Sequence, residues 1–205
     1  MTKTSRTKLI GIFITWLSCF PSTALAADLD MPYVIGVKLR AGGRFDNVRR
    51  CVATSKGTPG GPAADISAFV ELPAGGGNTV QIDLPIMRPI LFAAAFDMLQ
   101  FEPSATFKFH DPNGGDIGWV LGPTLGMSLH YGPDYHSDLK GRKFFALGPI
   151  IGGYAGLDFR RPNKAFNFEL GLTPYFIPLF GVDDSQNHKG IVVGGLLDAA
   201  FRFAI

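Results

Sequence analysis

The sequence lacks a long hydrophobic run. Although 46% of its 205 residues are hydrophobic, no segment after the N-terminal leader has eighteen consecutive apolar residues without a charge. A bundle of membrane-spanning helices needs about 20 apolar residues per span, so this class is excluded. Cysteine is also scarce. Only Cys19 and Cys51 occur, and Cys19 lies in the leader, which excludes an internal disulfide in the remaining chain.

The N-terminal leader, residues 1–26, has the three parts of a secretory signal peptide. A basic start is followed by a short apolar run and by Ala24-Leu25-Ala26, a small-x-small cleavage site. We expect its removal, which leaves one domain over residues 27–205. The leader holds three positive charges and no negative one, so its loss takes the net charge from +2 to about −1. A nucleic-acid-binding function then has no electrostatic basis, and we expect no nucleic-acid partner.

Large apolar residues alternate with small or polar ones in eight stretches of the chain. Phe166 and Phe168, for example, alternate with Asn167 and Glu169. A period of two is that of a β-strand. The eight predicted strands are residues 33–42, 64–72, 79–86, 98–109, 117–131, 144–159, 165–181 and 191–205.

The connections between the predicted strands alternate in length. Three are short (74–78, 110–116 and 160–164), and three are longer (43–63, 132–143 and 182–190). Short turns at one end and longer loops at the other are typical of transmembrane barrels. In lipid every backbone polar group needs a partner, so a spanning sheet must close on itself. We therefore predict an all-β fold, a closed antiparallel up-and-down transmembrane β-barrel of eight strands, with both termini at the turn end.

Residues 87–97, MRPILFAAAFD, do not fit this pattern. They are apolar where an external loop should be polar, and the outward-facing positions change from even to odd numbers across them. We expect a β-bulge or a tight apolar hairpin there. In the strand 165–181 we expect Phe166 and Tyr175 to bracket the membrane as parts of two aromatic girdles.

The C-terminal stretch LLDAAFRFAI completes a resemblance that also rests on the signal peptide, the alternation and the loop lengths. The chain resembles the small eight-stranded outer-membrane barrels of Gram-negative bacteria, the OmpA, OmpX, OmpW and opacity-type group, over residues 27–205. The resemblance implies a place in the bacterial outer membrane, with outer-membrane lipid, lipopolysaccharide and the barrel-assembly machinery as partners. Family members tend to end in an aromatic residue, whereas this chain ends in Ile205. No motif assigns a subfamily, a solute or an oligomeric state.

The faces opposite the apolar ones carry charges of both signs. In a lipid-embedded barrel these charges face the lumen, where they must be paired. We expect an internal ion-pair network that fills the barrel, and a polar pathway for small solutes is the alternative. The charged residues are Lys38, Arg40, Asp65, Glu71, Asp83, Glu102, Lys108, Asp158, Glu169, Asp198 and Arg202.

Ser128 and His130 are the candidates for catalysis. Alternation places both on the inner face near a strand end, with Asp or Glu available across the lumen, which is the minimum for a base-activated serine. The resembling group includes lipid A-modifying enzymes, and its deacylases use a His-x-Ser pair, the reverse of the order here. A serine and a histidine without a catalytic role are the simpler interpretation, so we expect no enzymatic activity and no cofactor. The four histidines have no ligand-like spacing, so we expect no metal site.

The first long connection carries Arg44, Arg49, Arg50 and Lys56 against Asp46. If it is extracellular, these four basic residues are candidate lipopolysaccharide contacts, because Arg and Lys suit phosphates. Solvated surface charge is the alternative.

The sequence therefore predicts an integral outer-membrane β-barrel with a structural, surface-interaction or narrow-channel role and no enzymatic activity. Two alternatives stay open. One is an outer-membrane lipid A-modifying hydrolase or acyltransferase. The other is an exported soluble lipocalin-like barrel, whose apolar faces would surround a ligand.

Overall fold

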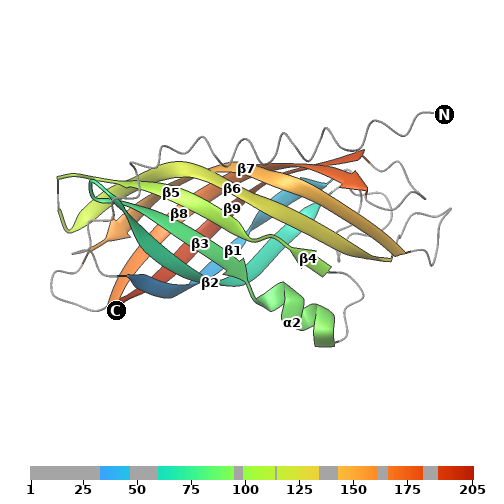
Figure 1. Cartoon of the computed structure of the whole chain (residues 1–205), viewed down its shortest axis with the longest axis horizontal. Coiled ribbons are helices and arrows are strands. Elements are labelled where there is room, and N and C mark those ends of the chain that lie inside the picture. Colours follow the sequence, from blue (N-terminus) through green and yellow to red (C-terminus); the bar gives the residue numbers. More distant parts are fainter. Residues whose placement is uncertain are drawn as a thin grey trace.

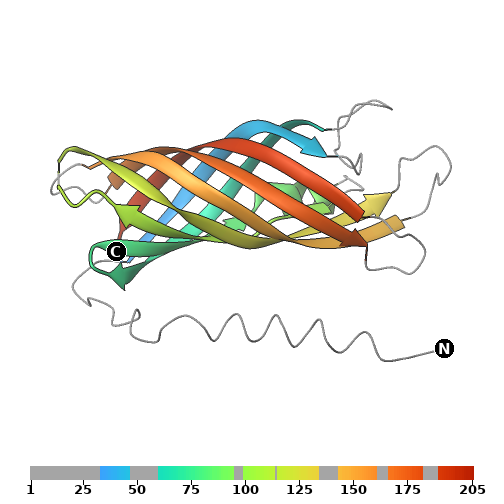
Figure 2. The same cartoon turned by 90° about the horizontal axis from the view of Figure 1, so that it is seen from above.

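The strands of the chain close into one antiparallel barrel (Figures 1 and 2). The computed structural model describes residues 33–46, 60–94, 99–113, 115–133, 143–160, 166–181 and 189–205. The predicted signal peptide lies outside these ranges. The elements are β1 (Val34–Asp46), β2 (Gly61–Gly75), β3 (Asn78–Pro85), α2 (Met87–Ala94), β4 (Leu99–Phe101), β5 (Ser104–His110), β6 (Ile117–Pro133), β7 (Lys143–Phe159), β8 (Phe166–Gly181) and β9 (Lys189–Ala204).

Neighbouring strands in the sheet follow the order β4-β6-β5-β3-β2-β1-β9-β8-β7, and an additional β6–β7 pairing closes the ring. β4 and β5 form one strand that is interrupted at Pro103. Leu99 and Ser104 pair with β6 in the same register on either side of the break. Pro103 has no N–H to donate, but its carbonyl accepts a hydrogen bond from the N–H of Met127 at 3.1 Å. The barrel thus has eight strands, and the predicted fold class is confirmed.

The alternation along the strands is inside out. On β1, Leu39 is 45% exposed whereas its neighbour Arg40 is 8% exposed. On β8, Leu170 is 44% exposed whereas Glu169 is fully buried. Apolar side chains therefore cover the outer wall and charged ones fill the interior, as in a barrel that faces lipid. A lipocalin-like barrel needs the reverse arrangement, so the structure removes that alternative.

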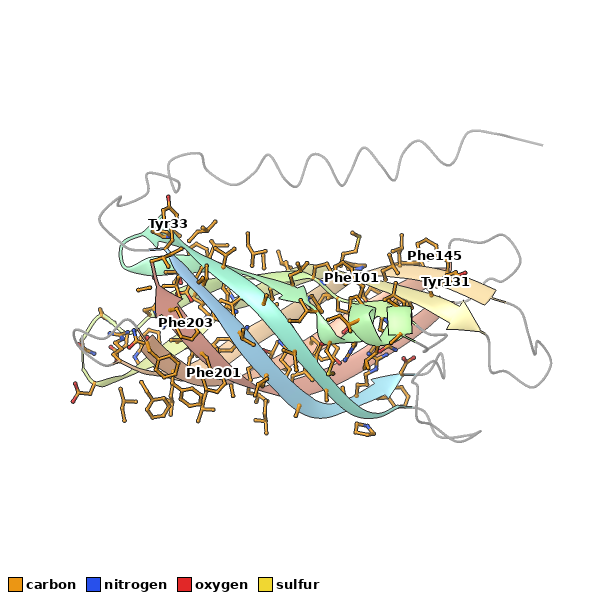
Figure 3. All side chains as sticks on the ribbon, turned by 90° about the horizontal axis from the view of Figure 1, so that it is seen from below. Tyr33, Phe101, Tyr131, Phe145, Phe201 and Phe203 are labelled. Atoms are coloured by element: carbon orange, nitrogen blue, oxygen red, sulfur yellow. The ribbon has the colours of Figure 1, made fainter. Side chains whose placement is uncertain are left out.

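Aromatic side chains gather at both ends of the outer wall (Figure 3). At the turn end, where the short connections lie, the rings of Phe166, Phe168, Phe201 and Phe203 pack with centroids 5.3 to 6.1 Å apart. At the opposite, loop end, Phe101, Tyr131 and Phe145 lie on the barrel (Figure 3). Two such belts are typical of transmembrane barrels.

The spacing of the two belts suits a bilayer. Phe145 and Phe159 lie fourteen positions apart on β7. At about 3.3 Å per residue they are about 46 Å apart along the strand, or about 33 Å across a membrane for a tilt of about 45°. This matches a hydrocarbon core of about 30 Å with its interfaces. Tyr175 does not take part, contrary to our prediction. It occupies an inward-facing position of β8 and is 7% exposed.

The prediction of a bulge or hairpin in residues 87–97 is wrong, because Met87–Ala94 form the helix α2. Leu and Ala favour helix, and Pro89 lies in the first turn, where its missing N–H breaks no intrahelical bond. The helix connects two strands of opposite face parity, so the parity change needs no bulge. Among the described helices, none is long and apolar enough to cross a membrane.

Prolines remain inside the strands at a cost in hydrogen bonding. The β7–β8 register is constant, but the ladder skips the positions around Pro149 and Pro178 and again those around Pro174. Proline cannot donate to a ladder. Loss of regular pairing at these points is therefore a direct result of the sequence.

Replacing Leu125 by Arg should lower the free energy of unfolding by about 2–4 kcal/mol, the cost of a cation on the lipid face near the midplane. Leu125 is 52% exposed at the middle of β6. Ile117→Arg is the matched control, because Ile117 lies on the same face of the same strand but at its turn end. There the expected loss is about 0–1 kcal/mol. Urea unfolding in lipid vesicles measures both, and equal losses would contradict a membrane-spanning wall.

Candidate functional site

The charged lumen is the candidate functional site. The structure places every charged residue predicted for it inside the barrel, and no more than 8% of any of these residues is exposed. Moving an ion out of water costs several kcal/mol, so buried charges have to be compensated locally. The pairs form three groups along the barrel, which we call the turn-side, middle and loop-side layers.

The turn-side layer is centred on Lys108 and Arg202. The Lys108 ammonium lies 2.6 Å from Glu169 and 3.5 Å from Glu71. The Arg202 guanidinium lies 2.7 Å from Glu71 and 3.0 Å from Asp158. Because β2, β5, β7, β8 and β9 all contribute to it, this layer ties opposite parts of the wall together across the lumen.

Neutral hydroxyl groups also donate to the carboxylates of the turn-side layer. The Tyr154 hydroxyl donates to Glu169 at 2.6 Å, and the Thr79 hydroxyl donates to Glu71 at 2.8 Å. The Lys108 ammonium also lies 5.2 Å from the centroid of the Tyr154 ring. The Tyr154 ring fits because Gly171 lies against it. A Cβ at that position would overlap the ring.

The middle layer joins β1 to β3 and β9. The Asp83 carboxylate lies 2.9 Å from the Lys38 ammonium and 3.2 Å from the Arg40 guanidinium. Arg40 also lies 3.5 Å from Asp198. Gln81 donates to Asp83 at 2.8 Å, and Thr173 donates to Asp198. With two carboxylates against two cations, this layer is balanced.

The loop-side layer holds two arginines and three carboxylates. Arg44 lies 2.9 Å from Asp46 and 3.4 Å from Glu102. Arg88, from the helix α2, reaches the same layer and lies 3.1 Å from Glu102 and 3.6 Å from Asp65. The helix thus contributes a side chain to the lumen although it is not part of the sheet.

Arg44 corrects one of our predictions. We expected it in a loop as a lipopolysaccharide contact, but it lies in β1 and its side chain is buried inside the lumen. β1 runs to Asp46, beyond the predicted end at residue 42, and both residues keep the inward-facing even parity of Lys38. The even parity of Arg44 and Asp46 in the sequence could therefore have predicted their inward position. The other candidate contacts, Arg49, Arg50 and Lys56, lie outside the described residues.

Ser128 and His130 come together with Glu102, but not as a proton relay. The Ser128 hydroxyl lies 2.8 Å from His130 Nε2 and donates to Glu102 at 3.1 Å. Glu102 also lies 3.4 Å from the same His130 Nε2. A relay needs the carboxylate on one ring nitrogen and the serine on the other. Both residues are also fully buried, so the trio fits a polar packing cluster.

The acidic residues of the lumen are of the type that metal ions use as ligands. Within the described parts of the chain, no group of three or more His, Cys, Asp or Glu residues could hold a metal ion. The carboxylates of the three layers instead have cationic or hydroxyl partners from the chain itself. Side chains nearly fill the interior of an eight-stranded barrel, and the paired charges of the three layers occupy that interior here.

No protein-family model matches the chain, and no curated protein matches it. Among solved structures, Neisserial surface protein A (NspA) is similar, with 16% identity and a TM-score of 0.53 over 83% of this chain and 97% of that one. The chain has the fold of the small eight-stranded outer-membrane barrels. The subfamily is left open.

Two further solved barrels match at a TM-score of 0.38, which is too low to add to the fold assignment. Ail, the attachment invasion locus protein of Yersinia pestis, is 12% identical over 84% of this chain and 100% of that one. The N-terminal β-barrel domain of Pseudomonas aeruginosa OprF is 15% identical over 82% and 97%. At these identities the likeness to outer-membrane barrels concerns the fold alone.

Replacing Lys108 by Met should lower the free energy of unfolding by about 3–5 kcal/mol, because it leaves buried carboxylates short of a cation. Combining Lys108→Met with Glu169→Gln should cost less than the sum of the two single changes, because the second change removes one of the stranded charges. Denaturant unfolding of the four proteins gives the coupling. Simple additivity would show that the 2.6 Å contact carries no interaction energy.

Proposed function

We propose that this chain is an integral protein of the bacterial outer membrane with a structural or surface-interaction role and a lumen closed to solutes. The observation that carries the proposal is the combination of an apolar outer wall with an interior of paired charges. The aromatic belts and the predicted signal peptide support the location. The fold shared with NspA supports it as well.

The positions of the ion pairs support a closed lumen. Lys108 on β5 reaches Glu169 on β8, and Arg202 on β9 reaches Glu71 on β2. These bridges connect strands that are not neighbours in the sheet. The middle layer lies next to them and is joined through Tyr154, whose ring lies near both Lys38 and Lys108. An ion would have to separate several buried pairs in succession to pass.

A barrel of this kind acts through what it presents at its ends. We propose that the long connections, residues 47–60, 134–142 and 182–188, face the outside and carry the surface-interaction role. Their basic residues Arg49, Arg50 and Lys56 remain our candidates for contacts with lipopolysaccharide phosphates. Outer-membrane lipid and the barrel-assembly machinery are the further partners that we propose.

The closed lumen is tested by electrical recording. Purified protein inserted into planar lipid bilayers should give no steady single-channel current, whereas an open porin recorded in the same bilayers serves as the positive control. Heat-dependent gel migration of the same preparation shows that the barrel is folded. A steady current from folded protein would refute the closed lumen and would favour the narrow-channel alternative.

The orientation is tested with single cysteines. On intact cells a membrane-impermeant maleimide should label the native Cys51, which lies in the first long connection. In a Cys51→Ser background it should not label Asn113→Cys, at an exposed position of a short turn. Permeabilised cells should allow labelling at both positions. Labelling of the Asn113→Cys protein alone on intact cells would invert the proposed orientation.

A further inference from the structure

The barrel wall has a gap on its loop side, between β2 and β4. The last residue pair between β2 and β3 joins Ser67 to Pro85, so the stretch of β2 from Gly61 to Ile66 is paired with β1 only. β4 is paired with β6 only. Within the described residues, these two strand edges therefore face each other without a connecting ladder.

The edge of β2 is adapted to this break. Pro62 has no N–H to leave unpaired, and the N–H of Ile66 donates to the carboxylate of Asp65 at 2.8 Å. The carbonyl of Ile66 accepts from the N–H of Ile86 at 2.8 Å, which is where the chain leaves β3 for the helix. An exposed strand edge in lipid is costly, because its polar groups have no water. Something has to cover it.

The helix α2 is the cover. It contacts both β2 and β4 and lies at the side of the barrel beside β4 (Figure 1). Its residues Ile90 and Leu91 are 64% and 39% exposed, so the helix presents an apolar surface to the outside of the barrel.

Arg88 is the link between this cover and the lumen. Its guanidinium lies 3.1 Å from Glu102 and 3.6 Å from Asp65, and donates to the side-chain amide oxygen of Gln100 at 3.2 Å. The side chain is 13% exposed. Three acceptors from β2, β4 and the β4–β5 break thus form a built site for one cationic group, which the chain fills with its own arginine.

Charge balance favours a cation as the occupant. The described residues of the loop-side layer carry three carboxylates and two arginines, beside the imidazole of His130. Arg44 is already shared between Asp46 and Glu102. If Arg88 moved out together with α2, Asp65 would lose its contact with Arg88, and Glu102 would lose the shorter of its contacts with Arg88 and Arg44.

We infer that α2 is a movable side panel of the barrel and that the gap beneath it is a binding site for an amphiphilic cation from the membrane. The ligand has a guanidinium or ammonium head and an apolar tail. Its head replaces the Arg88 guanidinium at Asp65, Glu102 and Gln100, and its tail lies against the apolar surface of α2. Arg88 competes with the ligand head for these acceptors and, when bound to them, keeps α2 against the barrel wall. This inference rests on the membrane location proposed above.

The test uses the full-length mature protein in lipid nanodiscs. The probe is a dodecylguanidinium ion with a photoreactive diazirine in its tail, and its twin carries a neutral hydroxyl head. After illumination, labelled peptides are mapped by mass spectrometry. The guanidinium probe should label residues 87–101 more strongly than the neutral twin does. Arg88→Ala should raise this labelling at least about tenfold, the factor that one charge-assisted hydrogen bond contributes.

Two sets of variants control the result. Adding Asp65→Asn and Glu102→Gln to Arg88→Ala should return labelling to the level of the neutral twin. Arg160→Ala should change nothing, although it also frees a carboxylate from an arginine at 3.3 Å, that of Asp158. Arg160 lies at the turn end, where the β6–β7 and β7–β8 ladders are continuous up to Phe159.

Every outcome bears on the inference. Equal labelling by both probes around the whole wall, or no gain from Arg88→Ala, would overturn it. If Arg88→Ala fails to show the heat-dependent migration of a folded barrel, the double variant Asp65→Asn, Glu102→Gln is made in the native background. There it must lower guanidinium labelling to the level of the neutral twin, or the inference fails. A protein that does not reconstitute into lipid would instead refute the membrane location.

Discussion

Closure of the backbone hydrogen-bond ladder is the constraint on which the rest of this structure depends. A chain in lipid cannot leave strand edges unpaired, so the strands form a ring. Once the ring is closed, the pleat sends alternate side chains to lipid and to the lumen. Each of the eight strands therefore has one apolar face and one polar face, and both result from the same geometry. Strand pairing thus decides where the charges of the described strands must go.

The interior follows from that assignment. Lys38, Lys108 and Arg202 occupy inward positions and cannot leave them without a change of register. Each is matched by a carboxylate from another strand. The ion pairs need not add stability relative to an apolar core. A slip of one residue would turn these charges toward lipid, so the charges disfavour other registers.

Much of this architecture could be predicted from the sequence, because the period of two in a strand can be recognised without knowing which strands it pairs with. The strands, the inside-out alternation and the inward position of the charged side chains all follow from local pattern. What could not be predicted depends on contacts between distant segments. The helix α2 was missed because its eight residues form only about two turns, too few for a 3.6-residue period to be recognised. Arg88 was missed because only the fold brings it to Glu102. The inward position of Arg44, by contrast, was present in the parity of β1 and was overlooked because the strand was ended too early.

The departures from regular pairing are not spread evenly. The prolines of β7 and β8 interrupt individual ladder positions, but both strands continue on either side of them. Between β2 and β4 the ladder itself ends, since β3 stops at Pro85 and β4 is only three residues long. This is also where the one described helix lies and where a lumen charge, Arg88, comes from outside the sheet. Between β2 and β4 the described part of the wall depends on the contacts of Arg88 and of the helix α2 rather than on a strand ladder. Such contacts can separate without breaking any strand pair, which distinguishes this part of the wall from the proline positions of β7 and β8.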